Sequence, residues 1–339
     1  MESLILQRLR ESINQRKANL TAWLKRTTPE VRKIREGPLG EKCVESRINE
    51  LETAMQKADD NSLGICEVCH EFVDNSRLEM DYTACVCIEH LTGTERTQLE
   101  NELELSQKVQ QALLPHRVPV IDGIELAAFS QPAHIVGGDY FDFFRFRDGA
   151  HGLVIADVMG KGMPASMLMA SLQASLRIIA PESLTPDQAM TRLNNVFCNN
   201  IRLTNFVTLF LARYSERDRM LAYCNAGHNP PVLSRQNGTI QYLQPTGAAI
   251  GLVEQTSFET ASISLEQGDR LLLYTDGVVE STDNAGEFFG EEGLEIFLKK
   301  SSHLGTNQVI TSLRDQLHEY TGKSTPADDT TMIVLRVTK

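Results

Sequence analysis

Residues 152–162 have the sequence GLVIADVMGKG. Apolar and small residues lead up to Asp157, and a turn with glycines at positions 160 and 162 follows it. A short apolar run that ends in turn residues is typical of a buried β-strand. The segment therefore predicts a strand whose last carboxylate leaves the hydrophobic interior at the end of a sheet.

Three further segments place an aspartate beside glycine or next to an apolar run. They are VGGDYFD at 136–142, YTDG at 274–277 and ADDTT at 327–331. An Asp-Gly pair alone is usually only a turn. We nevertheless expect the carboxylates that adjoin apolar strands to emerge side by side at one sheet edge, namely those of Asp157, Asp276 and Asp328.

Carboxylates that lie close together repel one another and need cations to neutralise them. Oxygen ligands of this kind favour Mg²⁺ or Mn²⁺ over zinc. Two such ions about 3.5–4 Å apart can hold a hydroxide and direct it at a phosphorus atom. The acidic segments therefore predict hydrolysis of a phosphate ester.

The chain after about residue 116 has the pattern of one α+β domain, residues 116–339. Predicted strands occur both in adjacent pairs and separated by helical pairs, which favours an antiparallel sheet sandwich with helices outside. The strands are expected at 124–130, 152–157, 206–213, 219–225, 231–234, 270–275 and 331–337, and the helices at 163–180, 186–201, 292–300 and 307–320.

The ordered blocks GGDYFD, DVMGKG, NAGHNPP, YTDGVVE and DDTT span residues 137–331. This set resembles the SpoIIE/RsbU branch of the PP2C-type (PPM) serine/threonine phosphatases, over about residues 105–338. The resemblance implies a PP2C-like αββα sandwich with two Mn²⁺ or Mg²⁺ ions at one end of the paired sheets. It also implies a phosphorylated protein substrate, in bacteria usually a STAS-domain anti-sigma antagonist, and hence a role in partner-switching signalling.

The resemblance assigns roles to five residues of the acidic segments. Asp157 is expected to bridge both ions, and the backbone carbonyl of Val158 to bind the second. Asp276 and Asp328 are expected to hold the first ion. Asp139 is expected to contact the second ion or its waters, and together with Asp157 it forms the predicted catalytic pair.

Other residues of these segments are expected to act around the ions. Asp142 and Asp329 are expected to accept hydrogen bonds and not to bind metal directly. His228 is either a turn histidine or a proton donor. The chain departs from many relatives at Ile135, where they have glutamate, and at Lys161, where several have histidine; Lys161 is expected to be a surface lysine.

Four of the seven cysteines lie between residues 66 and 87. The sequence is CEVC at 66–69 and CIEH at 87–90, and two chelating pairs at this spacing can close a tetrahedron around zinc. Cys85 and His70 are alternative ligands. The favoured set for one structural Zn²⁺ is Cys66, Cys69, Cys87 and His90.

The cysteine segment resembles the zinc-binding module of the DksA/TraR family, through GICEVC at 64–69, RLE at 77–79 and VC at 86–87. Helical patterns before it predict a helical hairpin over residues 1–60, followed by the zinc module over 61–94. The DksA/TraR proteins act on RNA polymerase through acidic residues at the hairpin tip, whereas the expected tip here is PEVRKIR, residues 29–35. We therefore favour a regulatory module over the alternative of a DksA-like transcription regulator with an appended phosphatase domain.

Residues 95–115 are predicted to form a linker helix between the two modules. Its apolar side chains cover about half of the helix circumference. Either a two-stranded coiled coil or packing on the chain's own domain would bury them. The stripe predicts a homodimer through this helix, with activity that depends on the helix being ordered.

Composition excludes several other classes of protein. The 339 residues are 41% hydrophobic and 23% charged, and the net charge is −12. The acidic charge argues against general nucleic-acid binding as a function. No apolar run approaches the ~18 residues of a membrane span, and the first residues lack a signal-peptide pattern, so we expect a cytoplasmic protein. The complete aspartate set argues against a non-catalytic binding module.

Overall fold

The computed structural model describes residues 10, 13–14, 17–18, 21–22, 25, 40–59, 63–71, 73, 85–200, 206–322 and 326–339. The chain divides into two compact units, Met1–Glu102 and Leu103–Lys339. The predicted hairpin tip at 29–35 and the RLE motif at 77–79 lie outside the described residues. None of the helices within the described ranges is long and apolar enough to cross a membrane.

The N-terminal unit contains helix α3 (Gly40–Asp59) and the short 3₁₀ helix η2 (Ile88–His90). The described residues between 10 and 25 are helical as well. Ile13 is fully buried against Leu51 and Ala54 of α3 and against Leu63. In this small apolar cluster, Leu51 and Ala54 lie on a helix of the predicted hairpin over residues 1–60.

The second unit contains two five-stranded antiparallel sheets. The first has the order β1-β10-β9-β6-β7, and the second β2-β3-β4-β5-β8. The bounds are β1 Ile124–Gln131, β2 Tyr140–Arg145, β3 His151–Val158, β4 Val207–Ser215, β5 Met220–Ala226, β6 Val232–Ser234, β7 Ile240–Tyr242, β8 Ala261–Ser264, β9 Arg270–Tyr274 and β10 Thr330–Val337.

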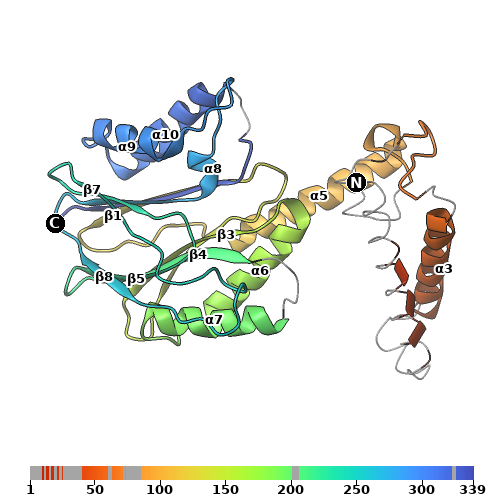
Figure 1. Ribbon diagram of the computed structural model, residues 1–339, viewed down its shortest axis with the longest axis horizontal. Coiled ribbons are helices and arrows are strands. Elements are labelled where there is room, and N and C mark those ends of the chain that lie inside the picture. Colours follow the sequence, from red (N-terminus) through yellow and green to blue (C-terminus); the bar gives the residue numbers. More distant parts are fainter. Residues whose placement is uncertain are drawn as a thin grey trace. The chain divides into compact units, whose positions relative to one another are not determined.

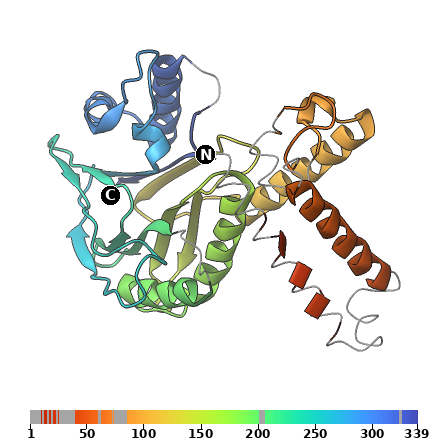
Figure 2. The same ribbon diagram turned by 45° about the vertical axis from the view of Figure 1, so that its right-hand side comes forward.

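Helices cover the outer face of each sheet (Figures 1 and 2). Helices α9 and α10 lie over the first sheet, while α6 and α7 lie over the second. The remaining helices are α5, which enters the domain, and the single turn α8. The bounds are α5 Gly93–Leu113, α6 Gly162–Ile179, α7 Pro186–Asn200, α8 Asp276–Val279, α9 Gly290–Lys300 and α10 Thr306–Thr321.

Alternation of side chains along each strand separates the hydrophobic interior into layers. In β3, Leu153 and Ile155 pack between the sheets, whereas Val154 and Ala156 pack under α6 and α7. Strand β9 alternates in the same way between the inter-sheet layer and the layer under α9 and α10. Strands buried on both faces explain why these segments are continuous apolar runs.

The fold confirms the predicted α+β sandwich with helices on both outer faces. Each predicted strand and helix of this domain is present within a few residues of its expected bounds. The sequence pattern missed β2, whose YFDFFR segment was interpreted only as part of an acidic motif, and the short strands β7 and β8. It also missed α8, a single helical turn that begins at Asp276 itself.

Candidate functional site

Four strand ends meet at one end of the sandwich. In the second sheet, β3 ends at Val158 beside the start of β2 at Tyr140, because the two strands are antiparallel. In the first sheet, β9 ends at Tyr274 beside the start of β10. The acidic segments are the loops at these ends. They come from both sheets, so the expectation of a single sheet edge was wrong.

Strand alternation directs Asp157 and Asp139 toward the space between the sheets. Asp157 follows Leu153 and Ile155, which lie four and two residues earlier on the inner face of β3. Asp139 lies two residues before Phe141, which packs between the sheets, so both side chains are on the same face. The two carboxylates therefore lie where the apolar layer between the sheets ends.

Asp139 is held across the sandwich by the first sheet. The hydroxyl of Thr275 donates to Oδ2 of Asp139 at 2.8 Å, and the backbone N–H of Thr331 donates to the same hydroxyl oxygen at 2.9 Å. Within the part of the chain that the structure describes, Oδ1 of Asp139 has no hydrogen-bond partner, although the residue is only 6% exposed. Because buried polar atoms are normally paired, this oxygen fits the position of a metal ligand.

Asp139, Asp157, Asp276 and Asp328 form an acidic centre in which burial and mutual repulsion raise the pKa values of Asp139, Asp157 and Asp276. Burial, followed by the charge of Asp157, raises the pKa of Asp139 well above its usual value. Burial and then the charges of Asp276 and Asp328 raise the pKa of Asp157 to about 7. Burial and the charge of Asp328 raise the pKa of Asp276 to about 6. Such a group is stable as carboxylates only with cations nearby, so its donor set fits divalent metal.

Asp329 accepts hydrogen bonds from the loop that leads to Asp139. Its two carboxylate oxygens accept the backbone N–H groups of Ala133, at 2.8 Å, and of Gly138, at 2.6 Å. A Cβ atom on Gly138 would lie 2.8 Å from the carbonyl oxygen of Val158, so only glycine allows this approach. Asp329 thus fixes the loop beside the Val158 carbonyl, as expected of a hydrogen-bond acceptor.

Asp142 lies inside the domain and joins β2 to α6. It accepts hydrogen bonds from the hydroxyl of Tyr140 at 2.7 Å and from Nε of Arg177 at 2.8 Å. The residue is 1% exposed. Asp142 therefore matches the expected outer hydrogen-bond acceptor and not a metal ligand.

His228 is buried next to the strand that carries Asp157. Its Nδ1 is 2.9 Å from the hydroxyl of Thr208, which pairs in register with Asp157. Burial lowers the pKa of His228 to about 3, so the imidazole is neutral near pH 7. A neutral, fully buried ring fits a structural turn histidine better than a proton donor.

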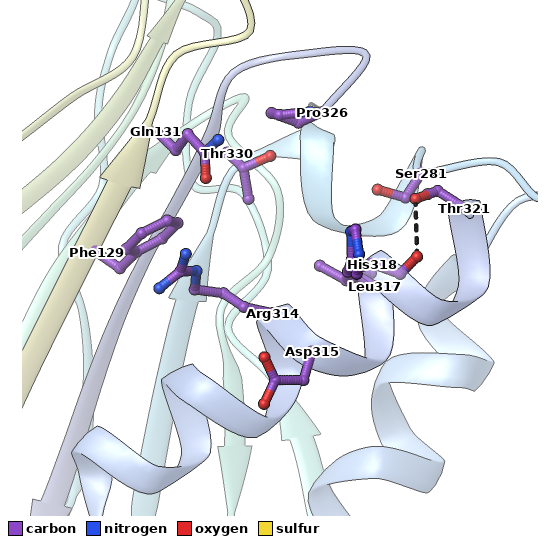
Figure 3. A pocket seen from close by; sticks show the side chains of 10 residues that line it. All are labelled: Phe129, Gln131, Ser281, Arg314, Asp315, Leu317, His318, Thr321, Pro326 and Thr330. Atoms are coloured by element: carbon purple, nitrogen blue, oxygen red, sulfur yellow. Dashed lines mark hydrogen bonds between the residues drawn. The ribbon is translucent and has the colours of Figure 1, made fainter. Parts of the chain in front are cut away.

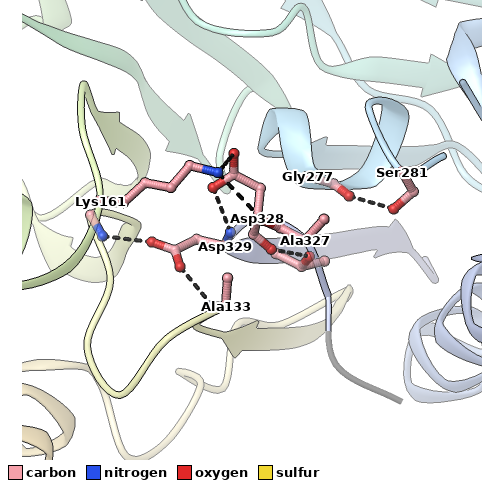
Figure 4. A network of polar contacts seen from close by, with 9 residues as sticks. Ala133, Lys161, Gly277, Ser281, Ala327, Asp328 and Asp329 are labelled. Carbon is pink, nitrogen blue, oxygen red and sulfur yellow. Dashed lines mark hydrogen bonds and ion pairs between the residues drawn. The ribbon is translucent and has the colours of Figure 1, made fainter. Parts of the chain in front are cut away.

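Lys161 has a more specific environment than that of an ordinary surface lysine. Its side chain is 52% exposed, but its ammonium group lies 2.7 Å from Oδ2 of Asp328. Figure 4 shows the lysine side chain extending over the Asp328–Asp329 segment to reach this carboxylate. Ile135, at the other departure from the family pattern, is 42% exposed.

A cavity of about 170 Å³ lies between β1, α10 and the segment before β10 (Figure 3). Thr330, which lines it, directly follows Asp329 in the chain. The guanidinium of Arg314 stacks over the ring of Phe129 at 4.0 Å from its centre. The cavity therefore places a cation and an aromatic face close to the segment that bears Asp328.

The cysteine segment gathers the four predicted ligands. Their ligand atoms all lie within 4.8 Å of one another. Sγ of Cys66 is 3.7 Å from Nδ1 of His90, and Sγ of Cys69 is 3.9 Å from Sγ of Cys87. The cysteines are free thiols, with no disulfide between them. These four residues form a candidate Cys₃His metal site, and the alternatives Cys85 and His70 are outside the group.

The thiols of this site do not have equal pKa values. Burial opposes ionisation of Cys66, but hydrogen bonds from the backbone N–H groups of Cys69, Cys87 and Val68 outweigh it and lower its pKa to about 5. Burial and the neighbouring sulfurs raise the pKa of Cys87. Three adjacent thiolates therefore require a cation, and sulfur and imidazole together are ligands that zinc prefers.

Comparisons with known proteins agree with this architecture. The family model described as "Stage II sporulation protein E (SpoIIE)" matches residues 147–338, more than half of the chain. The chain belongs to the SpoIIE family of PP2C-type protein serine/threonine phosphatases. The acidic centre therefore occupies the end of a PP2C fold.

Individual relatives in this family are similar to most of the chain. Phosphoserine phosphatase RsbU of Bacillus subtilis is 29% identical over 240 residues, which cover 70% of this chain and 71% of RsbU. The PP2C domain of SiaA from Pseudomonas aeruginosa has a TM-score of 0.64 at 20% identity, over 72% of this chain and 99% of that domain. A structure of the PP2C phosphatase domain and a fragment of the regulatory domain of SpoIIE from Bacillus subtilis has a TM-score of 0.53 at 21% identity, over 63% of each chain.

Two residues of the site were missed at the sequence level. Thr275, which orients Asp139, stands beside Asp276 in the YTDG segment, and its partner is 136 residues away in the chain. The charge of Glu280, at the end of α8, contributes to the raised pKa values of Asp157 and Asp276. Its place four residues after Asp276, one helical turn, was the available signal for Glu280.

Proposed function

We propose that the chain hydrolyses phosphoserine or phosphothreonine on a protein substrate with two Mn²⁺ or Mg²⁺ ions bound at the acidic centre. The observation that carries the proposal is the buried Oδ1 of Asp139, which has no hydrogen-bond partner among the described residues and lies beside carboxylates with raised pKa values. Bound ions would activate water and neutralise charge on the phosphoryl oxygens.

The chain's own residues hold and orient this centre. Asp157, Asp276, Asp328 and the Val158 carbonyl supply oxygen ligands from both sheets. Thr275 fixes one oxygen of Asp139 and leaves the other directed away from protein donors. Asp329 ties down the loop between Ala133 and Gly138 by two hydrogen bonds. This preorganisation favours ion binding because the ligands need little rearrangement.

A phosphorylated STAS-domain anti-sigma antagonist is the substrate that we propose. The chain resembles RsbU along 71% of that protein's length, and RsbU is named as a phosphoserine phosphatase. A partner-switching role follows from this similarity. It is tested by offering phosphorylated STAS-domain proteins encoded in the same genome.

Dephosphorylation of such a protein, or of para-nitrophenyl phosphate, is expected to require Mn²⁺ or Mg²⁺. EDTA should abolish the reaction, and excess Mn²⁺ should restore it, because the ions would both generate the hydroxide and neutralise charge on the phosphoryl oxygens. Phosphate release measures the rate. Full turnover in buffer stripped of divalent metal would overturn the proposed mechanism, and hydrolysis of para-nitrophenyl phosphate without release from any STAS-domain protein would overturn the substrate assignment.

We also propose that Cys66, Cys69, Cys87 and His90 bind one structural Zn²⁺. The supporting observation is the compact group of four ligand atoms, which lacks the open position of a catalytic zinc site. The module around it would then be regulatory and not part of the hydrolytic site.

Helix α5 provides a physical connection for regulation. Gln110 on α5 forms two hydrogen bonds with the backbone of Gly137: its amide donates to the carbonyl oxygen at 2.6 Å, and its carbonyl accepts the N–H at 3.0 Å. Gly137 is two residues from Asp139. We propose that the order of α5 reaches Asp139 through this contact. Leu105 and Val109 on α5 are 62% and 55% exposed, which fits the proposed homodimer and can be measured by sedimentation of the full chain.

Gln110→Ala is expected to lower phosphatase activity about tenfold, since the Gly137 loop loses its two hydrogen bonds to α5 and Asp139 becomes less well positioned. Gln111→Ala, on an exposed position of the same helix, is the matched control and should retain wild-type activity. Steady-state kinetics at saturating Mn²⁺ measure both variants. Equal rates for Gln110→Ala and Gln111→Ala would exclude coupling between α5 and Asp139 through the hydrogen bonds to Gly137.

A further inference from the structure

Both oxygens of the Asp328 carboxylate are engaged by the chain itself. Oδ2 lies 2.7 Å from the ammonium of Lys161, which is also 3.3 Å from the carbonyl oxygen of Ala327. Oδ1 accepts the backbone N–H of Asp329 at 2.9 Å. Asp139, by contrast, has one oxygen for which the described residues supply no hydrogen bond. Of these two proposed ligands, Asp328 is therefore the one already paired with a cation (Figure 4).

The backbone places Lys161 at this position. Lys161 is extended, with φ −131° and ψ 161°, and directly precedes α6. The glycines on either side have φ angles of 111° and 67°, a region that favours glycine. This sharp connection between β3 and α6 brings the lysine, four residues after Asp157, alongside the Asp328 loop.

A lysine ammonium has three donors and no acceptor, so it cannot coordinate a metal ion. It neutralises Asp328 in the same way as an ion would, and two cations at one carboxylate oxygen repel each other. We propose that Lys161 is a tethered cation that competes with a divalent ion for Asp328, so that the ion enters only when the ammonium leaves. This inference rests on the proposed two-ion function of the acidic centre.

The exposure of the pair indicates a reversible competitor. The side chains of Lys161 and Asp328 are 52% and 34% exposed, and ion pairs at such positions are weak. Lys161 should therefore weaken ion binding without blocking it. We expect removal of the Lys161 charge to lower the dissociation constant of the divalent ion about threefold to tenfold. Both the ion pair with Asp328 and the repulsion between the ammonium and the ion are then lost, and both losses favour ion binding.

The test is calorimetric titration of Mn²⁺ into the full chain, stripped of other divalent ions and saturated with zinc to occupy the cysteine site. Lys161→Met is expected to bind Mn²⁺ about threefold to tenfold more tightly than the wild-type chain. Lys161→Arg keeps the charge and should bind as the wild type does. In an Asp328→Asn background, Lys161→Met should have no effect on the remaining Mn²⁺ binding.

Lys339→Met is the matched control, because Lys339 pairs with Asp122 at the same 2.7 Å on a remote, exposed surface. Its Mn²⁺ affinity should equal that of the wild type. Unchanged or weaker Mn²⁺ binding by Lys161→Met, with normal binding by the wild type, would overturn the role of Lys161 alone. Absence of Mn²⁺ binding by the wild-type chain would overturn the proposed two-ion function, and the competition with it.

Discussion

Asp157→Asn is expected to lower kcat about a thousandfold while the fold stays intact. Asp157 is the carboxylate proposed to contact both ions, and loss of a charged ligand removes several kcal/mol of transition-state stabilisation, where each ~1.4 kcal/mol is a factor of ten. Asparagine has the same shape, and Asp157 lies at a strand end outside the apolar layers. Phosphate release at saturating Mn²⁺, together with circular dichroism, measures both expectations.

The same substitution is expected to raise the stability of the metal-free protein near pH 8. The pKa of Asp157 is raised by burial to about 7 in the folded chain, against about 3.9 for an unfolded one. A group with a raised pKa contributes stability that is fully present below about pH 4 and is lost as the pH rises to about 7. At pH 8 the wild-type chain in EDTA therefore carries an unfavourable, partly buried charge that asparagine lacks.

Thermal unfolding in EDTA between pH 4 and pH 8 should show a higher Tm for Asp157→Asn at pH 8. The difference in Tm between Asp157→Asn and the wild type should narrow toward pH 4. This difference should also shrink when the wild-type protein is measured with Mn²⁺ in place of EDTA. Asp122→Asn, on the exposed surface, serves as the control and should change neither kcat nor this pH dependence. Near-native turnover of Asp157→Asn would contradict the assignment of Asp157 to the catalytic site.

The position of the acidic centre was predictable because its signals are local. The apolar runs beside Asp157, Asp276 and Asp328 mark strand ends, and the ordered set of motif blocks carries the family resemblance that predicts the fold. The contribution of both sheets was not predictable in this way. It depends on how β3 and β9 face each other across the inter-sheet layer, which links residues more than 100 positions apart.

Contacts that depend on tertiary packing were also absent from the sequence pattern. Thr275 looks like one more polar residue before a turn, but its hydroxyl reaches Asp139 across the sandwich. Lys161 looks like a surface lysine until the loop before β10 brings Asp328 to it. Strands β7 and β8 have only three and four residues, too few for alternation to distinguish them from loops.

The cysteine site could be predicted in more detail because chelating pairs are short in sequence. CEVC and CIEH each form a tight turn, with hydrogen bonds from the N–H of His70 to the Cys66 carbonyl and from the N–H of His90 to the Cys87 carbonyl, both at 2.9 Å. The choice between Cys85 and Cys87 required the structure. The carbonyl of Cys85 accepts the N–H of Glu67 at 2.8 Å, while its thiol lies outside the group of four.

Cys66→Ser is expected to unfold the module around the cysteine site. Among the described residues of this unit, the apolar clusters are small: one contains Ile13, Leu51, Ala54 and Leu63, and the other has Cys66 and Val73 as its buried members. Cores of this size rarely support a fold without metal or disulfides. Structural zinc contributes about 10–16 kcal/mol to folding in small modules, so losing one thiolate ligand should remove most of the module's stability.

The expected result has two parts that separate the module from the phosphatase domain. The wild-type chain should contain about one zinc per chain by elemental analysis, and Cys66→Ser should lose most of it. Limited proteolysis should then cut within residues 40–92, while Leu103–Lys339 keeps its own unfolding transition and its Mn²⁺-dependent hydrolysis. Cys198→Ser, at a partly buried cysteine of α7, should keep the zinc and the protease resistance. A module that stays folded and protease-resistant without zinc would contradict the proposed zinc site. The cysteines would then be clustered buried thiols, because a metal-dependent module should lose its structure when one ligand is removed.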